Sequence, residues 1–338
     1  MKSITAVVLI GVLVFAIAVV GVELMVKAAP VKGKIVLQNT TGRTWDAYHG
    51  ELQNLASNLT AKGYTVVIAT NGITSDVLSG AQGLIIIKPK TDENLYTDAE
   101  INAIKNWFNE GGKFLWVASD SDYIEPYLTS TKFKTDTANR ILEAVGSVLR
   151  FDYCSVEDPT TNAGAPYRVV SNVTNTQNSD AAQITKGVVN ALFHGPTVVA
   201  GYKNGKLVPF DDVESDNVFW IFKTTPNGVI VDNDPSSPPQ AYTVGEKGSY
   251  VLMAAEKYAG PNKDCKVIVS AEGPYGDHGG FTNSYHGVTL QGTTWVLQAI
   301  DWGMTVEKKA AMPTTLIIAA VVIVAIIAVA AFMLTKKK

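Results

Sequence analysis

Short apolar runs alternate with amphipathic stretches from Gly33 onward, and this alternation organises most of the chain. Positions 45–62 and 97–110 carry apolar residues at helical spacing and predict helices. Thr97, with Glu100 three residues on, predicts a capping box at the start of the second helix. Buried strands are predicted over 34–37, 64–69, 83–87 and 113–118. The second and third runs are almost wholly apolar, as in strands that helices cover on both faces. The pattern therefore predicts an α/β fold, a three-layer flavodoxin-like or Rossmann-like sandwich.

The second half of the chain has a looser pattern. A helix is predicted over 138–149, and the residues at 193–200 predict a turn that leads into a strand. The turn-rich, acidic segment 203–248 predicts a loop-rich and strand-rich insertion. Regular structure is expected again at 250–257, 266–270 and 293–302.

Both ends of the chain are apolar, which bears on location. The C-terminal run 316–334 contains no charged residue, spans roughly 28 Å as a helix and is followed by Lys336, Lys337 and Lys338. This pattern predicts a transmembrane helix with a cytoplasmic basic tail at 335–338, preceded by a juxtamembrane linker at 304–315. The domain at 33–303 is then expected outside the cell, on a single-pass membrane protein.

The N-terminal run supports the same orientation. Residues 4–22 are apolar, Lys2 precedes them, and Val26-Lys27-Ala28 has the small-residue pattern of a cleavage site. Residues 1–28 are therefore predicted to be a signal peptide, with a retained N-terminal anchor as the alternative.

An exterior location changes how the cysteines and the charge are interpreted. In an oxidising compartment we expect Cys154 and Cys265, the two cysteines of the chain, to form a disulfide. Sequons at Asn39, Asn58 and Asn172 predict a glycoprotein if the host glycosylates its surface proteins. The net charge of −3 and the lack of a basic stripe argue against a nucleic-acid partner.

The predicted strand 113–118 ends at Ser119, Asp120, Ser121 and Asp122, where α/β enzymes often place a nucleophile. A nucleophile elbow needs small residues on both sides of the nucleophile, because the turn is sharp. Neither serine has such neighbours. We therefore expect this strand end to lack a nucleophile.

Three stretches resemble the class I glutamine amidotransferase-like superfold: NEGGKFLWVASD, KVIVSAEG and GTTWVLQAIDW. The resemblance extends over about 33–303 and is closest to a non-catalytic branch. That branch holds ectodomains of gliding-motility-type ABC transporter auxiliary proteins, GIFT domains of intraflagellar transport proteins and secreted prokaryotic proteins. The chain lacks the G-x-C-x-G and His-x-Glu motifs of catalytic members. The resemblance thus implies a protein without amidotransferase activity.

Candidate ligand-binding residues gather at two predicted strand ends. Asp120 and Asp122 follow one strand, and Asp277 and His278 lie in a glycine-rich loop after another. Ligands bind sheets of this type at the carboxyl ends of the strands, so these four residues are the predicted site, with a glycine-rich surface turn as the plain alternative. We expect no cofactor. Calcium is the alternative, because oxygen ligands are supplied by Asp211, Asp212, Glu214, Asp216, Asp232 and Asp234.

The expected function is that of a membrane-anchored surface module for binding or assembly. Its expected partners are components of an ABC-type transporter, as the resemblance implies, or an envelope glycan or protein. One alternative is a secreted metal-assisted hydrolase, which requires the four candidate side chains to converge in a crevice. A structural envelope subunit is a further alternative, and it would self-associate through a large apolar patch.

Overall fold

A large central sheet dominates the computed structural model, which describes residues 32–44, 50–276 and 278–305. Its strands, in sheet order, are β2 (Thr65–Ala69), β1 (Lys34–Gln38), β3 (Ala81–Ile86), β4 (Phe114–Ala118), β16 (Cys265–Ser270), β15 (Val251–Ala259), β12 (Val218–Lys223) and β8 (Val173–Thr174). The pairs from β2 to β16 are parallel, and those from β16 to β8 are antiparallel. The predicted α/β class with a mainly parallel sheet is confirmed.

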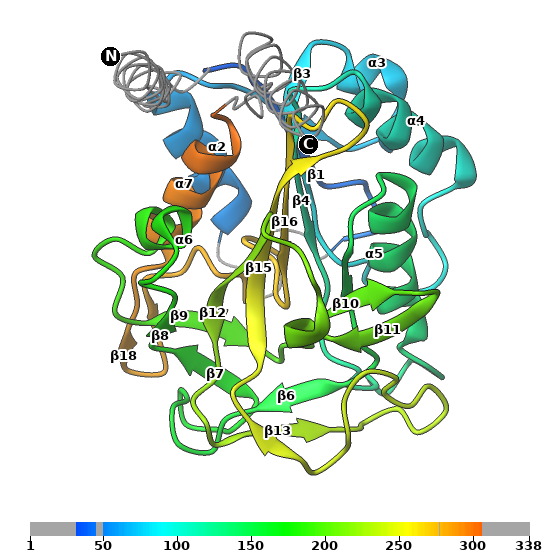
Figure 1. Ribbon diagram of the computed structural model, residues 1–338. Coiled ribbons are helices and arrows are strands. Elements are labelled where there is room, and N and C mark those ends of the chain that lie inside the picture. The colour runs from blue at the N-terminus through cyan, green and yellow to red at the C-terminus, as the bar shows by residue number, and fades with distance from the viewer. Residues whose placement is uncertain (1–31, 45–49, 277, 306–338) are drawn as a thin grey trace, which may run out of the picture.

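Helices cover both faces of this sheet and form three layers with it (Figure 1). One face carries α2 (Glu51–Ala61), α6 (Ser179–Ile184) and α7 (Gly292–Gly303), and the other carries α3 (Ser75–Leu78), α4 (Asp98–Asn109) and α5 (Lys132–Ala144). Successive residues of β1 alternate between the layers: Ile35 and Leu37 pack into one apolar cluster, and Val36 packs into the other. This alternation explains why the parallel strands are apolar throughout.

The capping box predicted at the start of α4 is present. The side chain of Thr97 accepts a hydrogen bond from the Glu100 amide, and the Glu100 carboxylate accepts one from the Thr97 amide. Glu100 also receives the guanidinium of Arg43 at 2.8 Å, which ties α4 to the loop after β1. Burial raises the pKa of Glu100, but hydrogen bonds from Arg43 and the backbone outweigh it and lower the pKa to about 2.

The helix predicted over 138–149 is wrong in its bounds. α5 spans Lys132–Ala144, and Gly146 follows it with φ of 70°, a left-handed conformation that ends a helix. Leu149 belongs instead to β5 (Leu149–Phe151), which pairs with β10 (Val199–Lys203). Strand pairing beyond the glycine therefore overrides the helical spacing of Val145 and Val148.

Several small sheets lie beyond the carboxyl ends of the parallel strands (Figure 1). Two of them have three strands: one consists of β11 (Lys206–Pro209), β10 and β5, and the other of β14 (Lys247–Gly248), β13 (Gly228–Val231) and β6 (Ser155–Glu157). Two more have two strands each: β7 (Arg168–Ser171) pairs with β9 (Ala191–His194), and β17 (Ser284–Tyr285) pairs with β18 (Val288–Thr289). A 3-10 turn, η2 (Phe210–Asp212), follows β11. The segment 203–248 is rich in strands and loops as predicted, but its strand β12 lies in the central sheet.

The predicted disulfide is wrong, because Cys154 and Cys265 are both free and buried. Cys154 packs in the apolar cluster on the α2 and α7 side of the sheet, and Cys265 packs in the cluster on the α4 and α5 side. The sheet thus separates the two thiols. Burial raises the pKa of both thiols, which keeps them protonated and unreactive.

Helices within the described ranges are all too short or too polar to cross a bilayer. The predicted segments at 1–28 and 316–334 lie outside the described residues. Of the three predicted sequons, Asn172 is exposed, whereas Asn39 and Asn58 are partly buried.

Candidate functional site

Three charged residues meet at the carboxyl edge of the parallel sheet. Lys88 follows β3, Asp120 follows β4 and Glu272 follows β16. The register pairs Ile86 with Val117 and Ser270 with Ala118, so the three strands end almost level. Parallel strands that end together bring the residues beyond them to one place, which is where sheets of this class bind ligands.

Asp120 is held between two lysines. Its side chain is almost fully buried, and its Oδ2 lies 2.8 Å from Lys88 Nζ and 2.8 Å from Lys134 Nζ of α5. Lys88 also lies 3.8 Å from Glu272 Oε1. Burial raises the pKa of Asp120, but the charges of Lys134 and Lys88 outweigh it and lower the pKa to about 2. The carboxyl is therefore ionised at neutral pH, and its charge is balanced by the protein.

Asp120, Lys88 and Lys134 line a cavity of about 400 Å³, here called the Asp120 cavity. Two tyrosines that line it are unusually exposed: Tyr123 is 54% exposed and Tyr167 is 40% exposed. The remaining lining residues come from the strand ends and from the small sheets: Ser121, Glu125, Ser155, Val156, Glu157, His194, Gly195 and Asn233. The cavity thus combines a polar interior with aromatic surface.

His194 ends β9 and brings an imidazole to this cavity. Its ring centroid lies 4.3 Å from that of His278 and 5.5 Å from that of Tyr167. Burial lowers the pKa of His194 to about 3, and the neighbouring His278 and Lys88 act in the same direction. His194 is therefore neutral at pH 7, so it can donate one hydrogen bond and accept another.

The turn after His194 packs directly on the end of β4. The Ser121 amide donates to the Gly195 carbonyl at 2.9 Å. Gly195 has φ of 60°, and a Cβ placed on it would lie 3.4 Å from Ser121 Oγ. A glycine is suited to this position because of both the conformation and the close approach.

Neither serine of this strand end is arranged as an activated nucleophile within the described residues. The hydroxyl of Ser119 is buried without a hydrogen-bond partner there, and Ser121 Oγ accepts a weak bond from the Tyr123 amide at 3.4 Å. Activation of a serine requires a base within hydrogen-bond reach. The arrangement instead suits ligand binding.

Of the four predicted site residues, Asp120 lines the cavity, and His278 packs against the cavity residue His194. Asp122 has a different role: its carboxylate accepts from the Ser155 hydroxyl, the Asn233 amide at 2.7 Å and the Asp234 amide at 3.3 Å. These bonds fix the loop after β13 beside the cavity. Asp277 lies outside the described residues.

The acidic loops proposed for calcium have protein partners. Asp234 accepts hydrogen bonds from the Thr131 amide at 2.8 Å and the Ser130 hydroxyl at 2.8 Å. Glu214 pairs with Lys203 at 2.9 Å. Within the described ranges, no three residues among His, Cys, Asp and Glu are grouped to hold a metal.

Sequence reasoning missed Lys88, Lys134, His194 and Asn233. For Lys88 a signal existed, because a lysine two residues beyond a buried strand lies at the same edge as Asp120. The other three depend on contacts between distant segments, such as the Lys134 Nζ to Ser121 carbonyl bond of 3.2 Å, and no local pattern marks them.

Comparisons with known proteins support the fold. No family model and no curated protein matches the sequence. Among solved structures, the mmIFT52 N-terminal domain is similar over 82% of this chain and 100% of that domain, with 13% identity and a TM-score of 0.52. At this identity the likeness concerns the fold alone.

Two further solved structures are more distant. One is a GMP synthase component from Thermoplasma acidophilum, at 13% identity, 80% and 93% coverage of the two chains and a TM-score of 0.36. The other is a ThuA-like protein from Parabacteroides merdae ATCC 43184, at 9% identity, 82% and 92% coverage and a TM-score of 0.38. At these TM-scores neither likeness supports a conclusion about this chain.

Proposed function

We propose that this protein is a membrane-anchored surface module that binds a neutral carbohydrate in the Asp120 cavity, without amidotransferase chemistry. The observation that carries the proposal is the pairing of Asp120 with Lys88 and Lys134 in a cavity that two exposed tyrosines also line. The paired charges provide fixed polar groups, and the tyrosines offer apolar faces with hydroxyl groups at the edge. Sugars need both, because they carry many hydroxyls and have C–H faces.

The charge of the cavity favours a neutral ligand. Its lining contains two lysines, Lys88 and Lys134, against the carboxylates of Asp120, Glu125 and Glu157. Burial raises the pKa of Glu157. Because no positive charge is in excess, an anionic ligand gains little here. Neutral His194 supplies a donor and an acceptor for hydroxyl groups. The side-chain NH2 of Asn233 donates to Asp122 at 3.0 Å and to Ser155 at 2.9 Å, so Asn233 can offer its Oδ1 as an acceptor.

The membrane part of the proposal comes from the sequence. The apolar run at 316–334 and the lysines after it would hold the domain at the outer surface. A role beside an ABC-type transporter or another envelope protein follows only from the family resemblance. The carbohydrate could then belong to the envelope or be delivered to a transporter.

A glycan array probed with the full chain in detergent tests the proposal. We expect retention of neutral oligosaccharides and a loss of about tenfold in affinity, or about 1.4 kcal/mol, for Tyr167→Ala and Tyr123→Ala. Tyr127→Ala is the matched control, because Tyr127 is also 54% exposed but does not line the cavity. Absence of glycan binding, or equal losses in all three variants, would refute the proposal.

A further inference from the structure

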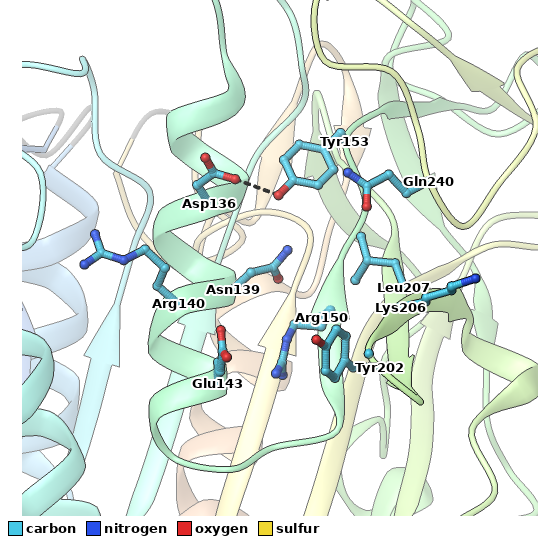
Figure 2. Close-up of a pocket in the computed structure, with 11 residues that line it drawn as sticks. Asp136, Asn139, Arg140, Glu143, Arg150, Tyr153, Tyr202, Lys206, Leu207 and Gln240 are labelled. Carbon is cyan, nitrogen blue, oxygen red and sulfur yellow. Dashed lines mark hydrogen bonds between the residues drawn. The ribbon is translucent and has the colours of Figure 1, made fainter.

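A second cavity, of about 420 Å³, lies between α5 and the β10–β11 hairpin (Figure 2). Asp136, Asn139, Arg140 and Glu143 reach it from the helix, and Tyr202, Lys206 and Leu207 reach it from the hairpin. Gly205, Tyr153, Gln240 and Arg150 complete the lining. It is here called the Arg150 cavity, because Arg150 is its most buried charged residue, with 5% of its surface exposed.

Arg150 is held in place at one end of its guanidinium. Nη1 donates to the carbonyls of Ser147 at 2.7 Å and Leu149 at 2.8 Å. The guanidinium carbon lies 4.7 Å from the centroid of the Tyr202 ring, a cation–π contact that Figure 2 shows at the cavity. The side chain is therefore fixed, while Nε and Nη2 make no hydrogen bond to any described residue.

The positive charge of Arg150 lacks a direct counter-charge. Among the described residues, no carboxylate oxygen lies within 4.0 Å of its nitrogens, in contrast to Arg43, which pairs with Glu100 at 2.8 Å. The nearby carboxyl of Glu256 bonds to the Ser147 hydroxyl, and burial raises its pKa. Burial lowers the pKa of Arg150, while the charges of Glu143 and Glu256, which make no direct ion pair with it, act in the opposite direction. A buried cation without an ion pair is costly, so an anion at this place would be stabilising.

We propose that the Arg150 cavity binds a small, singly charged carboxylate ligand, with Nε and Nη2 of Arg150 donating to the two carboxylate oxygens. The planar fork of an arginine matches a carboxylate in this way. Asp136 and Glu143 also line the cavity, so a phosphate dianion would meet more repulsion than a monoanion does. The inference goes beyond the proposed function, because it concerns a different cavity and a ligand of different charge.

Calorimetric titration of the full chain with galacturonate and galactose tests this inference. The two sugars differ at C6, where galacturonate has a carboxylate. We expect galacturonate to bind at least about tenfold more tightly, and Arg150→Lys to remove that advantage, since charge-assisted bonds contribute about 1.5–3 kcal/mol. Equal binding of both sugars, or unchanged galacturonate binding by Arg150→Lys, would overturn the inference. Tighter binding of inorganic phosphate than of galacturonate would also overturn it.

Three further variants make the test independent of folding defects and of the proposed function. Glu143 is exposed and has no ion pair within the described residues, so Glu143→Gln should fold normally and bind galacturonate several-fold more tightly. Arg140→Gln is the control: Arg140 also lines the cavity, but its guanidinium is already paired with Asp98 at 2.6 Å, so we expect less than a twofold change. Tyr167→Ala should leave galacturonate binding intact. If it abolishes binding, the carboxylate occupies the Asp120 cavity and the inference fails.

Discussion

The Asp120 and Arg150 cavities solve the same electrostatic problem in opposite ways. Each has a charged side chain that is almost fully buried. In the first, the protein supplies the counter-charges, since Lys88 and Lys134 each lie 2.8 Å from Asp120. In the second, Arg150 has two carbonyl partners and an aromatic ring but no carboxylate in contact within the described chain. A cavity whose buried charge is neutralised by protein side chains suits a neutral ligand. A cavity whose buried charge has no ion-pair partner suits an ion of the opposite charge.

The two cavities lie on either side of one short stretch of chain. Tyr153 lines the Arg150 cavity, and Ser155 lines the Asp120 cavity. Immediately before this stretch, Asp152 is buried, and its carboxylate accepts from the amides of Gln240 at 2.8 Å and Ala241 at 2.9 Å. These hydrogen bonds fix the start of the stretch, so we expect the two cavities to bind ligands independently.

The largest expected effect is on stability, through the ion pairs of the Asp120 cavity. Asp120→Asn leaves Lys88 and Lys134 buried without their shared counter-charge, and we expect it to lower the free energy of unfolding by about 3–5 kcal/mol. Urea denaturation measures this. Asp98→Asn is the control, because the exposed Asp98–Arg140 pair should contribute less than about 1 kcal/mol. Equal effects of the two substitutions would contradict the difference that we draw between buried and exposed pairs.

The next largest effect is a dependence of stability on pH, which we attribute to His194 in the Asp120 cavity. Its pKa is about 3 in the folded protein, against about 6.5 when unfolded, so the unfolded chain binds the extra proton first. Stability is therefore full above pH 6.5 and falls as the pH drops toward 3, by up to about 2 kcal/mol at pH 5. His194→Asn should flatten this decline in urea titrations at pH 7, 6 and 5. An unchanged decline would show that His194 is not its source.

The smallest expected effect on stability comes from a substitution in the Arg150 cavity. Arg150→Met removes a buried cation that has no ion pair, so the saved desolvation should offset most of the lost bonds to Ser147 and Leu149. We expect a change of about 1 kcal/mol or less in the free energy of unfolding without ligand. A loss as large as that of Asp120→Asn would mean that Arg150 has a structural role, and the comparison between the cavities would fail.

The framework of the fold could be predicted from the sequence, because it depends on local patterns. The apolar runs located β1 to β4 and β16, and Thr97 with Glu100 marked the start of α4. The bounds of α5 could not be found in this way, since strand pairing of Leu149–Phe151 competes with helical spacing. The disulfide prediction was wrong for a related reason. It rested on an oxidising compartment, which does not determine the face of the sheet on which a cysteine lies.

The candidate site was predictable only in part. Asp120 follows a buried strand, so the general rule for strand ends finds it. Lys134 reaches Asp120 from a helix, and His194 reaches the same cavity from β9, through contacts that sequence spacing does not record. Asp122 satisfies the same rule as Asp120, yet its carboxylate fixes a loop. Position along the strand therefore locates the edge of the sheet but does not assign roles there.

The most direct test of the account is titration calorimetry of the full chain with the neutral oligosaccharide that the array selects. Wild type, Tyr167→Ala and Arg150→Lys are compared under the same conditions. The account predicts that Tyr167→Ala weakens binding about tenfold and that Arg150→Lys leaves it unchanged. Binding that depends on Arg150 and not on Tyr167, or no binding by the wild type, would contradict it.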